Sequence, residues 1–406
     1  MTARKTAAWY AGFTGYALLA GLLSGLPVER WWGLCAAGGY AAAALIARWR
    51  PSRWQAATAV VAAAGAVAAP LAWQVTGGLH QPKTGEGALR VVDRAGWLLL
   101  HHGTPYLASS QLSGPVSYNP YEPVLAVFGL PRGAGLAGWA GDPRLWFGIF
   151  GVSVLLGAFL VAGQRRPAYY TAALFSSPLL ALPLVLGGTD VPVLALLCLT
   201  LALLRKDPGF AAWAGLTVGL ACAMKATAWP AVPVIAIMLA VRDGDAIALR
   251  FAIASIATTV AGMIAAAPAA LASPGSLTEN VVVFPLGLTR RQTTAASPLP
   301  GHLLAEAGVP GHWAAIGFLA AAIIAAGIWL ALRPPADLSA ASHRLALLYA
   351  VIFIAAPATR WGYFIYPLTI LAWNRLASIG LTTQMAPGEG PSVPQPDKAL
   401  PDPRLI

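Results

Sequence analysis

Long apolar runs divide the sequence, and they restrict its fold more than any other feature. A helix needs about 20 mostly apolar residues to cross a membrane, and runs near that length recur along the chain. We therefore predict an all-α, polytopic membrane protein with about twelve transmembrane helices. We expect the sixth, seventh, eighth and eleventh spans, which are short, to be tilted, broken or partly re-entrant. The predicted spans are residues 7–26, 31–47, 55–76, 145–163, 168–187, 190–204, 209–224, 227–241, 250–271, 313–332, 345–357 and 361–378.

The amino-acid composition also indicates a membrane protein. Charged residues make up 10% of the 406-residue chain, whereas about 25% is usual for a soluble domain. The net charge is +11, but the basic residues are scattered between apolar runs, so we interpret them as orientation signals and phosphate ligands and expect no nucleic-acid partner. The three cysteines lie inside apolar runs without zinc-ligand spacing, so we predict no metal and no cofactor. Heavy use of Arg, Ala and Gly is typical of a bacterial genome rich in G and C.

The basic residues alternate along the chain in a way that predicts sidedness. If the N-terminus is cytoplasmic, the short outer loops carry only Arg30, Lys225 and Arg360. This asymmetry predicts a multi-pass protein of the plasma membrane with both termini in the cytoplasm. The segments predicted to lie inside carry Arg4, Lys5, Arg48, Arg50, Arg53, Arg165, Arg166, Arg205, Lys206, Arg242, Arg333, Arg344 and Arg375.

We divide the chain into three parts. Residues 1–54 would form an N-terminal transmembrane hairpin, residues 55–378 a transmembrane catalytic module, and residues 379–406 a disordered cytoplasmic tail. Two long segments of the module, 77–143 and 272–312, fall on the predicted outer face. The first has helical spacing over Leu89–His102, with polar residues on one face, which predicts an interfacial helix. We expect a second interfacial helix over Pro120–Leu130.

The outer face of a membrane has no ATP, so a group-transfer reaction there needs a leaving group that is already activated. Polyprenyl-phosphate sugars meet this need, because the lipid phosphate leaves as the sugar is transferred. Such an enzyme requires a carboxylate or histidine as a base, and cations where phosphate charge develops. It needs no nucleotide-binding domain, and the sequence contains no P-loop or Rossmann fingerprint.

Three residues are candidate catalytic groups. Asp93 lies on the first predicted interfacial helix; the structural alternative is an ordinary ion pair with Arg90, three residues earlier. Glu86 precedes the same helix, and its alternative is a solvated loop residue. His302, in the second outer loop, would take part only if it met Asp93 in space.

Glu122 is not among these candidates. It occupies a position near a helix N-terminus, which favours a carboxylate for structural reasons.

Four cations are candidate phosphate ligands. Lys225 lies between two apolar runs, a placement that indicates function, although a snorkelling lysine is the alternative. Arg290 and Arg291 are adjacent in the second outer loop, where guanidinium groups could clamp phosphate or contact lipid headgroups. Arg360 lies at an outer span end, where it could bind phosphate or anchor the interface.

Four further residues are candidates for substrate binding. Asp190 follows a Gly-Gly turn that lets a ligand approach the backbone; the alternative is a helix N-cap beside Thr189. Tyr118 and Asn119 lie in the segment YNPYEP. Trp229 could pack beside a lipid phosphate held by Lys225.

Two segments, VVDRAGWLLLHHGTPYL and VSYNPYEPVLAVFGLP, resemble glycosyltransferase family 87, the bacterial polyprenyl-phosphate-mannose-dependent mannosyltransferases of the C-type glycosyltransferase fold (GT-C). The late segment PATRWGYFIYPL resembles the family's final outer turn, so the resemblance covers roughly residues 55–378. The family's acidic residue usually lies further upstream, near Arg90, which keeps Glu86 as an alternative base. The loop also follows the third predicted span instead of the first. The elements that resemble the family are Asp93, Leu98–Leu100, Gly103, Pro105, Tyr106 and Tyr118–Pro120.

The resemblance implies a hexosyltransferase that works on the outer face without a metal. Its partners would be a polyprenyl-phosphate sugar donor, whose sugar the resemblance implies to be mannose, a lipid or glycan acceptor of the cell envelope, and membrane lipid. A transporter or lipid flippase is the alternative, and it would show charges near the middle of spans and paired broken helices. An inactive homologue that binds lipid-linked sugar is a third reading.

Overall fold

The computed structural model describes residues 3–49, 55–76, 87–272, 274–289 and 293–379. Within these ranges the chain forms helices and no β-strand, so the predicted all-α class is confirmed. An isolated bridge pairs Ala296 with Thr359. The predicted disordered tail lies outside the described residues, apart from its first residue.

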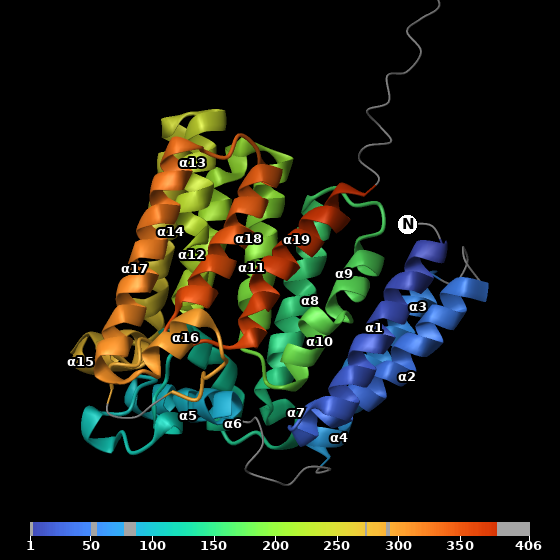
Figure 1. The fold of residues 1–406 in the computed structure, drawn as a ribbon, viewed down its shortest axis with the longest axis horizontal. Coiled ribbons are helices and arrows are strands. Elements are labelled where there is room, and N and C mark those ends of the chain that lie inside the picture. The colour runs from blue at the N-terminus through green and yellow to red at the C-terminus, as the bar shows by residue number, and fades with distance from the viewer. Residues whose placement is uncertain (1–2, 50–54, 77–86, 273, 290–292, 380–406) are drawn as a thin grey trace, which may run out of the picture.

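The longer helices run side by side between the two ends of a bundle (Figure 1). The bundle consists of α1 (Ala3–Leu23), α2 (Pro27–Trp49), α3 (Gln55–Ala63), α4 (Ala69–Val75), α8 (Pro143–Val161), α9 (Pro167–Phe175), α10 (Pro178–Val185), α11 (Asp190–Lys206), α12 (Ala211–Met224), α13 (Ala231–Asp243), α14 (Asp245–Ala266), α17 (Gly308–Leu332), α18 (Leu338–Ala355) and α19 (Ile365–Ser378).

The chain is a multi-pass membrane protein. In the described ranges, six helical segments are long and apolar enough to cross a membrane, or up to seven if the bent pair α9–α10 is one span. A helix lies at each of the twelve predicted ranges, but α11, α12 and α19 contain 17, 14 and 14 residues. These are shorter than the roughly 20 residues that a span needs. The number twelve therefore stays a prediction.

A bend of 57° separates α9 from α10 within the predicted fifth span. Pro178 begins α10 and disfavours a helical conformation at the residue before it, and Ser177 is accordingly extended, with ψ of 155°. The carbonyl of Ser176 accepts a hydrogen bond from the Tyr40 hydroxyl of α2 at 2.5 Å. The break therefore also connects the N-terminal hairpin to the bundle.

Small residues let the N-terminal helices pack closely. A Cβ atom on Gly33 of α2 would lie 2.3 Å from the backbone nitrogen of Gly21 in α1, so only glycine fits at this crossing. Trp32 donates its indole N–H to the carbonyl of Ala66 at 2.9 Å, within the π-helical turn η1 (Ala64–Ala68) that joins α3 to α4. The hairpin thus shares one hydrophobic core with the bundle, and the domain boundary at residue 54 stays a prediction.

Short helices from both predicted outer loops gather at one end of the bundle, which we call the loop end (Figure 1). They include α5 (Gly87–His102), α6 (Leu130–Gly133), α7 (Gly138–Gly141), α15 (Pro274–Thr278) and α16 (Pro300–Ala305). The loops also contain the short turns η3 (Pro115–Ser117), η4 (Pro123–Gly129) and η8 (Glu279–Val283), and η7 (Pro268–Ala272) leads into the second loop.

Direct contacts hold the two loops together. The backbone N–H of Asn119 donates to Asn280 Oδ1 at 2.7 Å, and the ring of Tyr118 stacks on Phe284 with centroids 4.2 Å apart. A helix is present where one was predicted over Leu89–His102, whereas the region 120–130 forms the 3₁₀ helix η4. The position of these helices relative to a membrane stays a prediction.

Candidate active site at the loop end of the bundle

Asp93 of α5 forms an ion pair with Arg132 of α6. Its Oδ2 lies 3.2 Å from Arg132 Nε, and the Asp93 side chain is 27% exposed. The other carboxylate oxygen, Oδ1, is buried without a hydrogen-bond partner. The sequence predicted Arg90, three residues earlier on the same helix, as the structural partner of Asp93. The observed partner comes from a segment 39 positions later in the chain.

Glycines bring these two helices close enough for the ion pair. A Cβ atom on Gly96 of α5 would lie 2.1 Å from the carbonyl carbon of Gly129, and one on Gly129 would lie 2.1 Å from the Val92 carbonyl oxygen. The backbones are therefore in direct contact, which only glycine permits. This contact sets η4 and α6 against α5 and places Arg132 beside Asp93.

The environment of Asp93 suits a base. Burial raises the pKa of its carboxyl to about 6, and Arg132 opposes this rise. Asp142 raises the pKa further and Arg144 lowers it. A carboxyl group with a pKa near 6 is largely ionised at neutral pH and still accepts a proton more readily than an ordinary aspartate does.

Asp142 and Arg144 form a second, buried ion pair at the start of α8. Asp142 Oδ2 lies 2.6 Å from Arg144 Nη2, and Asp142 also caps the helix by accepting from the Arg144 N–H at 2.9 Å. Arg144 donates further to the Val185 carbonyl at 3.3 Å and to the side-chain oxygen of Gln74. No role was predicted for these two residues from the sequence, where they stand directly before a predicted span.

A second polar cluster lies between the ends of α11, α12, α13 and α19. Lys225 is 7% exposed and forms an ion pair with Asp190. The Tyr366 hydroxyl donates to Asp190 Oδ1 at 2.6 Å and lies 2.6 Å from Thr227 Oγ1. Lys225 Nζ also lies 5.5 Å from the ring centroid of Tyr121. Lys225 and Asp190, predicted separately as phosphate and substrate ligands, are therefore each other's partners.

Glu122 is a buried carboxylate for which the sequence predicted only a structural role. It is 1% exposed, and neither carboxylate oxygen has a hydrogen-bond partner. Burial raises the pKa of its carboxyl to about 7. Its backbone N–H donates to the Met224 carbonyl at 3.1 Å, which fastens the YNPYEP segment beside Lys225. One feature of the sequence could have indicated this site: Glu122 stands between Tyr121 and Pro123, and no residue of opposite charge is close to it along the chain.

The sequence pattern of glycosyltransferase family 87 matches residues 119–357, more than half of the chain. The chain belongs to glycosyltransferase family 87. It is accordingly a glycosyltransferase, with a sugar donor and an acceptor as its substrates. No curated protein and no solved structure matches the sequence. The matched range contains Arg132, Glu122 and the Lys225–Asp190 pair, whereas Asp93 lies before it.

Two candidate substrate ligands of this family 87 chain connect the loops instead of facing open space. Tyr118 is 4% exposed and Asn119 is 2% exposed. Besides its bond to Asn280, Asn119 donates from Nδ2 to the Pro105 carbonyl at 3.2 Å. Arg94 of α5 holds the same segment by donating to the carbonyl of Ser117 at 2.8 Å. A substrate could meet these side chains only if the loops separate, so their role in binding stays a prediction.

Three other candidates, Trp229, His302 and Arg360, contact residues other than Asp93. Trp229 is 48% exposed and lines a groove of about 220 Å³ between α12, α13 and α14. His302 Nδ1 lies 2.9 Å from the Pro357 carbonyl, and its Nε2 lies 3.3 Å from Glu306 without making a hydrogen bond. Arg360 donates to Thr294 Oγ1 at 2.5 Å. A catalytic role for His302 was conditional on contact with Asp93, and the contacts of its ring are instead with Pro357 and Glu306.

Glu86, Arg290 and Arg291 lie outside the described residues, so their predicted roles stay predictions. In the part of the chain that the structure describes, no group of three or more His, Cys, Asp or Glu residues is arranged to hold a metal ion.

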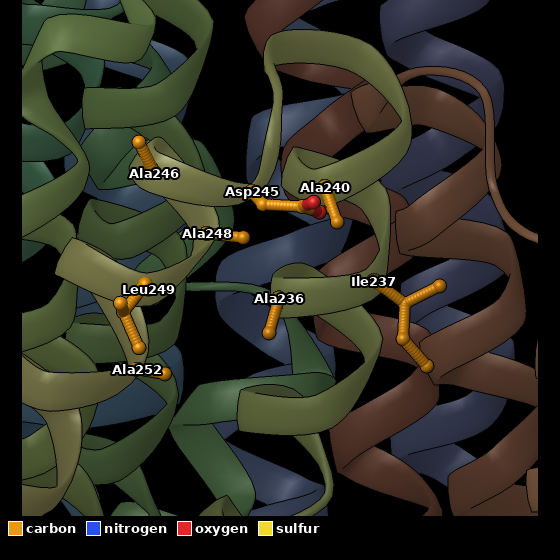
Figure 2. A pocket seen from close by; sticks show the side chains of 8 residues that line it. All are labelled: Ala236, Ile237, Ala240, Asp245, Ala246, Ala248, Leu249 and Ala252. Carbon is orange, nitrogen blue, oxygen red and sulfur yellow. The ribbon is translucent and has the colours of Figure 1, made fainter.

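A groove lies away from this chemistry, at the end of the bundle opposite the loop end. It has a volume of about 510 Å³ and opens between α13 and α14. Figure 2 shows that its walls are almost entirely small and apolar, with Asp245 as the one polar side chain among the residues drawn. Nothing in this groove could accept or donate a proton at a sugar except that exposed carboxylate, so we place the candidate active site at Asp93.

Proposed function

We propose that the chain transfers a hexose, mannose by family resemblance, from a polyprenyl phosphate to a cell-envelope glycolipid or glycan on the outer face of the plasma membrane. Membership of family 87 supports the transfer of a sugar. The gathering of both long loops at one end of an apolar bundle supports a reaction at a membrane surface.

The observation that carries the proposal is the Asp93 carboxylate, partly exposed at the loop end and with a pKa of about 6. Asp93 would accept the proton of an acceptor hydroxyl as its oxygen attacks the anomeric carbon of the donor. The bond from that carbon to the phosphate oxygen breaks, and the polyprenyl phosphate leaves with the electron pair. Glu86 is the alternative base.

Cations are needed where the phosphate charge develops. Arg360, Arg290 and Arg291 are our candidates, and Arg360 is exposed at the loop end. Lys225 could contact phosphate directly only if its ion pair with Asp190 opened. In the closed arrangement, Lys225 would instead hold together the ends of α11 and α12.

Replacement of the base tests this proposal. We expect Asp93→Asn to reduce transfer at least about hundredfold in membranes supplied with radiolabelled polyprenyl-phosphate mannose, because an amide cannot accept the proton. Asp245→Asn, the same change at an exposed aspartate at the opposite end, is the matched control and should keep wild-type turnover. Undiminished transfer by Asp93→Asn would assign the base to Glu86 or reject the mechanism.

One observation is relevant to the alternative of a transporter or flippase. The bent pair α9–α10 is a broken helix, but the described residues contain a single such pair, whereas inverted repeats place broken helices in corresponding positions of two halves. Uptake of a lipid or solute into vesicles without any sugar donor would support that alternative.

A further inference from the structure

Trp97 and the two histidines at the end of α5 form an exposed aromatic cluster. The rings of Trp97 and His101 are stacked, with centroids 4.6 Å apart and 25° between their planes, and His102 meets Trp97 edge-on at 5.4 Å. Trp97 is 46% exposed, and both histidines are exposed. An exposed aromatic surface is typical of a binding site or of a contact with lipid.

The stacked pair of Trp97 and His101, which we call the aromatic platform, is held in place by backbone contacts. Nδ1 of His101 lies 2.8 Å from the Trp97 carbonyl oxygen. A carbonyl only accepts, so Nδ1 carries the hydrogen and Nε2 of the neutral ring is an acceptor. A Cβ atom on Gly133 of α6 would lie 3.0 Å from the Trp97 Cα atom, so α6 packs closely against this turn of α5. The platform is therefore preformed.

The aromatic platform lies one helical turn after Asp93. Residues four apart on an α-helix share a face, with Cβ atoms about 5–6 Å apart, and helical side chains are directed toward the N-terminus of the helix. The side chain of Trp97 is therefore directed to the turn that carries Asp93, and the stacking of His101 on Trp97 shows the same direction one turn later. Because this spacing is similar to the width of a sugar ring, a ring on the indole would place its edge at the Asp93 carboxylate.

The surroundings of Trp97 favour a polar ligand over lipid. The apolar face of α5, which includes Val92, Ala95 and Leu98, is buried in protein, so it needs no lipid to cover it. Acyl chains on the other face would remove water from ionisable side chains without replacing their hydrogen bonds. The exposed residues of α5 are Gly87, Arg90, Trp97, Leu100, His101 and His102.

A pyranose ring matches both kinds of group on this face. The face of an aromatic ring is electron-rich and attracts C–H groups, and a pyranose presents C–H groups on its faces and hydroxyls around its rim. We propose that the aromatic platform binds a pyranose ring of the acceptor, which stacks on the platform and donates a hydroxyl hydrogen bond to His101 Nε2. This inference rests on the proposed function and adds to it the residues that recognise the acceptor.

Variants of the platform test this subsite. Trp97→Leu keeps an apolar side chain without an aromatic face, and His101→Phe keeps a stacked ring without the acceptor nitrogen. With octyl mannoside as the acceptor probe and labelled polyprenyl-phosphate mannose as the donor, we expect Trp97→Leu to raise the KM for octyl mannoside about tenfold, and His101→Phe to raise it less. The KM for the donor should not change. Trp213→Leu, the same change at a tryptophan of α12 that is 62% exposed, is the matched control and should match the wild type.

A competitor without a ring separates stacking from a general disturbance of the site. Octyl glycerol has hydroxyls but no pyranose, so it should inhibit transfer to octyl mannoside equally in the wild type and in Trp97→Leu. Weaker inhibition of Trp97→Leu by octyl glycerol, to the same degree as the rise in KM for octyl mannoside, would overturn recognition of the ring. An unchanged KM for octyl mannoside in Trp97→Leu would overturn the subsite and identify Trp97 as a contact with lipid. A rise in the KM for the donor alone would overturn the assignment to the acceptor.

A binding measurement separates this inference from the proposed function. In saturation-transfer NMR with the full-length protein and no donor, the ring C–H protons of methyl α-mannoside should show a signal that Trp97→Leu reduces and Trp213→Leu keeps. If the wild type transfers no mannose from the polyprenyl donor but this signal depends on Trp97, the proposed donor fails and the subsite stands. If mannose is transferred and the signal does not depend on Trp97, the subsite fails and the proposed function stands.

Discussion

Burial and the neighbouring charges act on the pKa of Asp93, and together they predict how transfer depends on pH. Burial raises the pKa of this carboxyl to about 6, while Arg132 lowers it. A base must be ionised to act, so activity is present above the pKa and is lost as pH falls through about 6. Arg132→Gln removes the larger of the two arginine charges that lower the pKa of Asp93, so the acid limb of the kcat/KM profile should move to higher pH.

The matched control for this profile is Arg333→Gln. Arg333 is exposed at the end of α17 away from the loops, so its loss should leave the acid limb in place. If folded, active Arg132→Gln has the same acid limb as the wild type, a group other than Asp93 is responsible for the loss of activity at low pH.

Glu122 makes a prediction about stability. Burial raises the pKa of its carboxyl from 4.5 to about 7 in the folded protein. The folded state therefore holds this proton more tightly than the unfolded state does, and the resulting stability is complete below about pH 4.5 and lost as pH rises through about 7. The loss is on the order of 3 kcal/mol. Glu122→Gln keeps the shape without a charge, so its melting temperature should fall less than that of the wild type between pH 5 and about pH 8.

Thermal unfolding of detergent-solubilised protein at the two pH values measures this difference. Glu306→Gln changes a glutamate whose side chain is 61% exposed, and it should follow the wild type. Equal pH dependence of the melting temperature in the wild type and Glu122→Gln would mean that water or a partner compensates the buried charge of Glu122.

At the level of helices, the sequence predicted what depends on local spacing. The apolar runs predicted a helix at each of twelve ranges, and the spacing of polar residues predicted the helix over Leu89–His102. The steric restriction that proline places on the residue before it also explains the break before Pro178. These features depend on residues that are close along the chain, so they can be inferred from a single sequence.

Contacts between distant segments could not be inferred in the same way. The ion pair of Asp93 with Arg132 depends on a backbone contact through Gly96 and Gly129, and a glycine in a loop does not reveal which segment it touches. The burial of Glu122 likewise depends on where η4 meets α12 and α14. In both cases the chemistry of a carboxylate is set by packing that no local pattern encodes.

At the level of the whole molecule, the arrangement of the chain brings its separate loops to one end. Contacts such as Asn119 with Asn280 join segments that lie 161 positions apart, so the described parts of the two loops are in direct contact. The groove between α13 and α14 lies at the other end of the bundle and is almost wholly apolar. This asymmetry between the ends indicates that one end carries the reaction, and the proposed function requires that end to face outward.

Sidedness is therefore the prediction on which the proposed reaction depends. In a variant without Cys35, Cys198 and Cys222, a single cysteine introduced as Leu100→Cys on the exposed side of α5 should react with a membrane-impermeant maleimide in intact cells. A single cysteine introduced as Ala246→Cys, in the exposed start of α14 at the opposite end, should react only after the membrane is permeabilised. The positive-inside pattern predicts this result, because the short loops predicted to lie outside carry few basic residues and those predicted to lie inside carry many. Labelling in the reverse order would place Asp93 in the cytoplasm, where the proposed transfer on the outer face has no site.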